Sequence, residues 1–184
     1  MPKLLTSRRV ENETELARQY VKTHILFPSV LLGFVMLLAG SAGLIYQFMV
    51  DTYGWQTFLE STGLLMVGGV VGWGQTRYHR YLLREHPGYF AGRLKTFSQS
   101  GPKRAKKESL SRPPEHRGQP YVPLFYLAGV GAVLSASAVS AVWGHVYPVA
   151  AFLMPWAGFF WAKMYGWRGV ISQGARTQQE GKRR

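Results

Sequence analysis

The sequence predicts an all-α integral membrane protein with four transmembrane helices arranged as two hairpins. Hydrophobic side chains make up 47% of the 184 residues and are gathered into long runs with almost no charge. Strongly basic segments separate these runs, since 22 Lys and Arg oppose 9 Asp and Glu. The cations also fall on one side of a four-helix topology, which is the usual mark of the cytoplasmic face.

The first hairpin is expected over residues 25–76. Ile25–Val50 contains no charged residue and exceeds the roughly 20 residues that a helix needs to cross a bilayer. Thr57–Thr76 is a second apolar stretch, and it carries a single acid, Glu60. Only a few residues separate the two stretches, so they should form a tight helical hairpin.

The second hairpin is expected over residues 121–168. Its helices are predicted at about Pro123–Tyr147 and at Val149–Trp167. The second of these carries Lys163, whose side chain can extend to the inner surface. Each hairpin has a small-residue segment in its first helix and ends in Gly-Trp followed by cations, so an internal duplication is a hypothesis.

The direction of the spans follows from the positions of the cations. Residues 1–24 hold five, residues 77–120 hold eleven, residues 163–184 hold six, and the two hairpin connections hold none. Lys and Arg near short loops resist translocation. Both termini and the middle segment are therefore predicted to be cytoplasmic.

The cytoplasmic segments have three expected forms. Residues 1–24 should contain an amphipathic helix that begins near Asn12 and kinks at Pro28. Residues 77–120 should lie at the headgroups and then become a flexible linker, and residues 169–184 form a basic tail. Interleaved cations and aromatics can also bind nucleic acid, but their place directly after a span favours anionic lipid. The residues expected to contact headgroups are Arg77, Arg80, Arg84, Arg93 and Lys95.

Small residues predict where helices pack closely. A regular four-residue spacing in the third span gives one narrow face, and a GxxxG pair lies in the second span. The partner helix could belong to this chain, to a second copy or to another protein. The predicted packing positions are Ala128, Ala132, Ala136, Ser140, Gly144, Gly68 and Gly72.

Reactive groups are scarce. The chain has no cysteine, which excludes disulfides, cysteine metal sites and thiolate catalysis. None of the five histidines has the spacing that places two imidazoles on one metal, so no metal site is predicted. His24 or His145 could be a single axial ligand of a haem or pigment, although an interfacial histidine bonded to headgroups is the commoner arrangement. The cofactor question stays open.

Glu60 is a possible intramembrane polar site. Acids within spans are costly and often mark proton or cation pathways. Its position near the start of the span permits a second interpretation, in which the carboxylate reaches outer water or stabilises the helix N-terminus.

These observations favour a noncatalytic accessory, assembly or scaffold subunit of a larger membrane complex, acting through helix packing and lipid anchoring. The expected partners are anionic lipids and either other integral membrane subunits or a second copy, and nucleic acid is not expected. The alternative is a small homo-oligomeric transporter or channel that uses Glu60. The expected location is the bacterial inner membrane, with the mitochondrial inner membrane as the alternative.

Overall fold

The computed structural model describes residues 13–98 and 119–183, with side chains described for 13–93 and 119–168. Every regular element in these ranges is a helix, which confirms the all-α prediction for this part of the chain. Two compact units are present: unit 1 comprises residues 1–27, 78–119 and 167–184, and unit 2 comprises residues 28–77 and 120–166. The labelled elements are η1 (Val21–Leu26), α2 (Phe27–Met49), α3 (Trp55–Glu85), α4 (Pro87–Ser98), η3 (Gln119–Tyr121), α6 (Val122–Trp143) and α7 (Pro148–Arg183).

Among the described residues, two helices are long and apolar enough to cross a membrane, Glu13–Met49 and Gln119–Trp143. Only 17% and 11% of the most apolar 18-residue stretch of each helix is buried in the structure. A soluble core helix of this composition would bury its apolar side chains, so the exposure indicates association with a membrane. The four spans and their orientation stay predictions.

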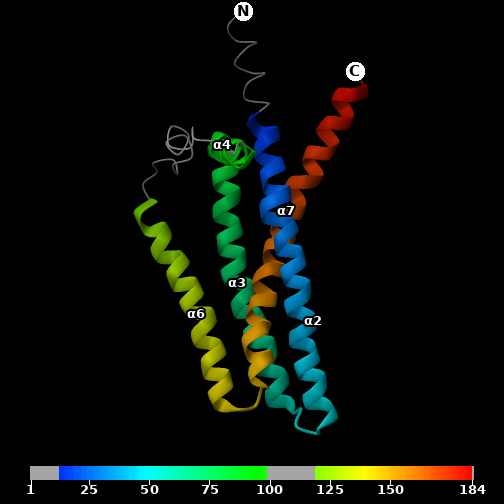
Figure 1. The fold of residues 1–184 in the computed structure, drawn as a ribbon, viewed down its shortest axis with the longest axis vertical. Helices are drawn as coiled ribbons and strands as arrows, with labels where there is room; N and C mark the ends of the chain where they lie inside the picture. Colours follow the sequence, from blue (N-terminus) through cyan, green and yellow to red (C-terminus); the bar gives the residue numbers. More distant parts are fainter. Residues whose placement is uncertain (1–12, 99–118, 184) are drawn as a thin grey trace, which may run out of the picture. The chain divides into compact units, whose positions relative to one another are not determined.

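Unit 2 contains both hairpins. The chain reverses between α2 and α3 at Asp51, which has a left-handed φ of 55°, and between α6 and α7 at Gly144, with a φ of 75°. Glycine suits the second position because it lacks the Cβ that makes a positive φ costly. Figure 1 shows the two connections at the same end of unit 2, which we call the connection end.

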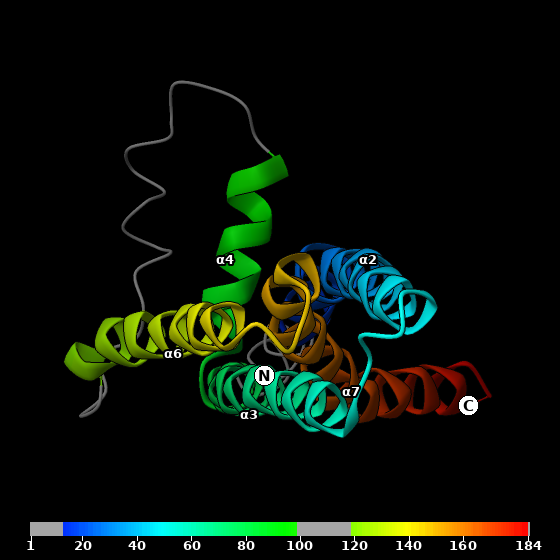
Figure 2. The ribbon, with the colours of Figure 1, turned by 90° about the horizontal axis from the view of Figure 1, so that it is seen from below.

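The first helix of each hairpin packs against the second helix of the other hairpin. On the α2–α7 side, a Cβ at Gly43 would lie 3.2 Å from the Cβ of Ala150, and one at Gly33 would lie 3.0 Å from the Cβ of Phe160. On the α6–α3 side, a Cβ at Gly129 would lie 2.9 Å from Val71 Cγ1. Viewed along unit 2 in Figure 2, α6 lies beside α3 and α2 lies beside α7.

The central contact joins α3 and α7 through glycines. A Cβ at Gly68 would overlap the carbonyl oxygen of Pro155, and a Cβ at Gly158 would overlap that of Leu65. A Cβ at Gly72 would also lie only 2.3 Å from the carbonyl oxygen of Phe159. Because each helix presents glycine to the other's backbone, the two axes approach more closely than any larger residue would permit.

Unit 1 has its own apolar cluster, to which each of its three stretches of chain contributes residues. The aromatic members Tyr20, Phe90 and Trp167 pack with Ala17, Val21, Leu82 and Leu83, and all are buried. The helix α4, which was expected only as an interfacial segment, contributes Phe90. This cluster gives unit 1 an apolar core of its own.

Two local expectations differ from the structure. The irregularity expected at Pro28 takes the form of a π-helical turn at Val21–Leu26, because proline cannot donate the backbone hydrogen bond that the carbonyl of His24 would otherwise accept. The basic tail expected after residue 168 is helical, since α7 continues to Arg183. Its only internal proline, Pro155, lies well before that segment. The linker that the sequence predicts falls largely within residues 99–118, outside the described residues.

The glycine contact makes a direct stability prediction. Gly68→Ala should lower the free energy of unfolding by about 1–3 kcal/mol, because its methyl group would collide with the Pro155 carbonyl. The matched control is Gly63→Ala on the same helix, where nothing lies within 4 Å of the added Cβ. That change should be neutral or stabilise the helix by up to about 1 kcal/mol. Thermal unfolding in detergent measures both, and equal effects would contradict the assigned contact.

Candidate functional site

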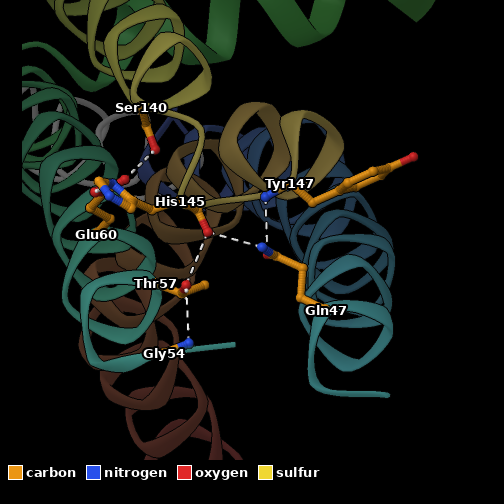
Figure 3. A network of polar contacts seen from close by, with 7 residues as sticks. All are labelled: Gln47, Gly54, Thr57, Glu60, Ser140, His145 and Tyr147. Carbon is orange, nitrogen blue, oxygen red and sulfur yellow. Dashed lines mark hydrogen bonds and ion pairs between the residues drawn. The ribbon is translucent and has the colours of Figure 1, made fainter. Parts of the chain in front are cut away.

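The main polar cluster lies at the connection end of unit 2. Glu60 Oε1 is 2.6 Å from His145 Nδ1, and Ser140 Oγ donates to Glu60 Oε2 at 3.2 Å. Figure 3 shows the three side chains converging from α3, from α6 and from the connection after it. The Glu60 side chain is 16% exposed and that of His145 is 42% exposed, so the carboxylate is enclosed while the imidazole reaches the surface.

Local structure explains how these residues meet. Glu60 lies in the second turn of α3, and Ser140 lies in the last turn of α6. Gly144 ends α6 in a left-handed conformation, with its N–H donating to the Ser140 carbonyl. This turn reverses the chain so that His145, the next residue, comes within reach of Glu60.

A second set of hydrogen bonds fixes the backbone of the same connection. Gln47 Nε2 and Thr57 Oγ1 both donate to the His145 carbonyl oxygen, each at 2.9 Å. Tyr147 N–H donates to Gln47 Oε1 at 2.9 Å. The connection of the second hairpin is therefore attached to both helices of the first. Since unpaired polar groups are expensive where water is scarce, such bonds set the register of the hairpins.

The order of the polar groups limits their chemistry. The carboxylate lies between the hydroxyl and the imidazole, so the Ser140 hydroxyl does not contact the imidazole as it would in a Ser-His-Asp triad. Within the described ranges, no group of three or more His, Cys, Asp or Glu side chains could hold a metal ion. The arrangement can neutralise an enclosed carboxylate and hold a proton between Nδ1 and Oε1.

An open pocket of about 520 Å³ adjoins the cluster, within the size range of small-molecule sites. Its walls come from the two connections and the helix ends beside them, and His145 is their only titratable group. The lining residues are Gln47, Thr52, Gly54, Trp55, Gln56, Thr57, Gly144 and His145.

The Glu60–Ser140 contact has an apolar counterpart on the other side of unit 2. Gly68 on α3 and Gly158 on α7 make the same kind of contact, and they lie 90 positions apart in the sequence. Glu60 on α3 and Ala150 on α7 are also 90 positions apart, so they occupy corresponding places on the two helices. The contact between Glu60 and Ser140 on the α3–α6 side thus corresponds to the contact between Ala150 and Gly43 on the α7–α2 side. One side closes with small apolar residues, and the other carries the hydrogen-bonded Glu60–His145 pair.

The predicted small-residue face of α6 is divided by the structure. Ser140 is buried and bonded to Glu60, and Ala136 packs against a buried cluster that includes Val146 and Met154. Ala128 and Ala132 are exposed, and Gly144 forms the turn. The residues of α6 that are buried in unit 2 are Val133, Ser137 and Ser140. On α3, Gly68 and Gly72 lie against the α7 backbone.

The predicted headgroup residues are placed as follows. Arg77, Arg84 and Arg93 are exposed, and Arg80 is half-buried. The side chain of Lys95 lies outside the described residues. Two of the arginines stack on rings four residues earlier on their own helices: the Arg77 guanidinium lies 5.3 Å from the Trp73 ring, and that of Arg93 lies 4.9 Å from the Tyr89 ring.

Sequence reasoning missed His145 as the partner of Glu60 and missed Gln47 altogether. The sequence separation of 85 residues hides the first contact. Gln47 carried a usable signal, because it is the one side-chain amide within the apolar run Ile25–Val50. A polar side chain in a span needs a hydrogen-bonding partner, and here it is 6% exposed.

Comparison with known proteins assigns no relative. No family model, no curated protein and no solved structure matches the chain.

The Glu60–His145 contact predicts energetic coupling across the hairpins. Glu60→Gln and His145→Ala should each destabilise the protein, and the double variant should be less destabilised than their sum by about 0.5–3 kcal/mol. The reason is that either change alone leaves the other polar group without its partner. A double-mutant cycle from detergent unfolding measures the coupling. Additive effects would show that the two side chains do not interact in the folded protein.

Proposed function

We propose that the chain is a noncatalytic accessory, assembly or scaffold subunit of a larger membrane complex. Its four predicted spans would place both termini and residues 77–120 in the cytoplasm, in a bacterial inner membrane or, alternatively, a mitochondrial one. The cation distribution supports this orientation. The proposed partners are anionic lipids and an integral membrane subunit or a second copy of the chain.

The observation that carries the proposal is the exposed small surface of α6. Ala128 and Ala132 are exposed, as are the nearby Gly131, Ser135 and Ala138. The opposite face of α6, at Val133 and Ser137, already packs within unit 2. By contrast, the glycines Gly68, Gly72 and Gly158 face neighbouring backbone.

Helix association in lipid explains why this contrast supports a partner. Lipid tails provide no hydrophobic drive, so helices associate where small residues permit close approach. The exposed face of α2 instead carries bulky side chains, including Leu31, Phe34 and Leu38, which suit lipid. A flat small-residue surface gains little from lipid and much from a second helix, so we assign the α6 surface to a partner.

A second candidate function is a small homo-oligomeric transporter or channel that uses Glu60. The observation favouring it is the contrast between the Glu60–Ser140 contact and the apolar Gly43–Ala150 contact at the corresponding place. A carboxylate at a place where the opposite side has only small apolar residues suggests a role beyond packing. The Glu60 carboxylate is bonded to His145 and Ser140 of its own chain, so this role requires the pair to open.

The partner surface is tested by adding bulk to it. Ala132→Leu should abolish retention of a partner during mild-detergent purification while the protomer stays folded, because the leucine would stand where two helices meet. Val35→Leu is the matched control, since Val35 is 50% exposed on α2, whose exposed face carries bulky side chains. Retention is read by native gel and mass spectrometry. Equal retention of partners by both variants would assign the α6 surface to lipid.

The transport candidate is tested by flux. Proton and cation flux into reconstituted vesicles should fall to the empty-vesicle level in Glu60→Gln if the carboxylate carries the ion. The Asp51→Asn variant, which neutralises the acid in the adjacent connection, controls for surface charge. Flux that is unchanged by Glu60→Gln eliminates this candidate.

A further inference from the structure

One exposed face of α3 changes from apolar to cationic along its length. Met66, Val70, Trp73 and Arg77 follow one another at intervals of four, three and four residues, which places them on one side of the helix. Met66 is 63% exposed, Val70 67% and Trp73 55%, and Arg77 is exposed as well. The whole stripe lies within unit 2 and faces away from the Gly68 and Gly72 contacts with α7.

The position of the Arg77 side chain is set by stacking on the Trp73 ring and not by an ion pair with a carboxylate. Its guanidinium lies over Trp73, and among the described residues no carboxylate pairs with it. A stacked guanidinium keeps its plane fixed while its N–H groups stay available along the edge. Such a group can donate two parallel hydrogen bonds to one phosphate, which a flexible ammonium cannot do.

We propose that this stripe binds one phospholipid molecule with an anionic headgroup. The apolar side chains Met66 and Val70 contact an acyl chain, the Trp73 ring lies at the glycerol level, and Arg77 donates to the phosphate. The order of the groups along α3 matches the order of those parts in a phospholipid. The proposal rests on the proposed membrane-spanning topology but not on the proposed partner of α6.

A lipid fits better than the other anions that an arginine binds. A soluble phosphate would need only Arg77 and would leave the apolar part of the stripe unused. Nucleic acid would be excluded from the depth of Met66 and Val70, because these residues continue a predicted span. Tryptophan is also enriched in membrane proteins at the level where acyl chains meet headgroups.

The test uses the full chain in vesicles of phosphatidylcholine with a minor fraction of phosphatidylglycerol. Native mass spectrometry then measures the phosphatidylglycerol retained per chain. Arg77→Lys preserves the charge but removes the planar fork, and it should reduce retention by at least about fivefold. Trp73→Leu keeps apolar bulk and removes the stacking surface, so it should also reduce retention. Arg18→Lys is the control, because Arg18 is exposed and stacks on no ring in the described part of the chain.

The outcomes separate the explanations. Loss in Arg77→Lys and Trp73→Leu with normal retention in Arg18→Lys supports the site. No loss in either Arg77→Lys or Arg18→Lys overturns it in favour of diffuse charge attraction, which depends on charge alone. Equal loss in the two variants also overturns it, because the effect would then not be specific to the stripe. Displacement of the lipid by millimolar inorganic phosphate would overturn the lipid assignment and identify a soluble anion site. Partner retention, measured on the same samples, reports separately on the proposed function.

Discussion

The contact between the α3 and α7 backbones is the constraint on which the rest of unit 2 depends. Gly68, Gly72 and Gly158 allow a spacing that any side chain would prevent. Once the second helices of both hairpins lie together, each first helix can pack only on the remaining sides. It packs on the second helix of the other hairpin, so α2 contacts α7 and α6 contacts α3. The two hairpins are therefore held together by contacts between a helix of one hairpin and a helix of the other.

This arrangement brings both connections together and gives the polar cluster its form. Gln47 and Thr57, from the first hairpin, hold the His145 carbonyl of the second, and Glu60 holds its ring. Charged groups cost free energy near hydrocarbon, and the corresponding contact between Gly43 and Ala150 avoids that cost. The Glu60–His145 pair thus distinguishes one side of the bundle from the other, which makes it the first place to look for activity.

Sequence patterns predicted what depends on local composition. The apolar runs at Ile25–Val50 and near Pro123–Tyr147 correspond to helices long and apolar enough to span a membrane. The pairing of Glu60 with His145 could not be predicted, because it depends on how two hairpins pack rather than on spacing. Sequence periodicity also could not predict which neighbour the small-residue face of α6 contacts. A four-residue repeat defines one face of a helix but does not say what lies against that face. In the structure Val133 is buried and Ala132 of the repeat is exposed.

The central claim is that the first helix of each hairpin packs on the second helix of the other. The chain has no cysteine, so introduced pairs can be oxidised without background. Gly43→Cys with Ala150→Cys should form a disulfide, because their Cβ atoms would lie 3.2 Å apart, and a shift of a few tenths of an ångström reaches the lower end of the roughly 3.5–4.5 Å range of disulfides. Gly43→Cys with Gly63→Cys should form none, since nothing lies within 4 Å of a Cβ at Gly63. Cross-linking of the second pair but not the first would contradict the exchanged packing.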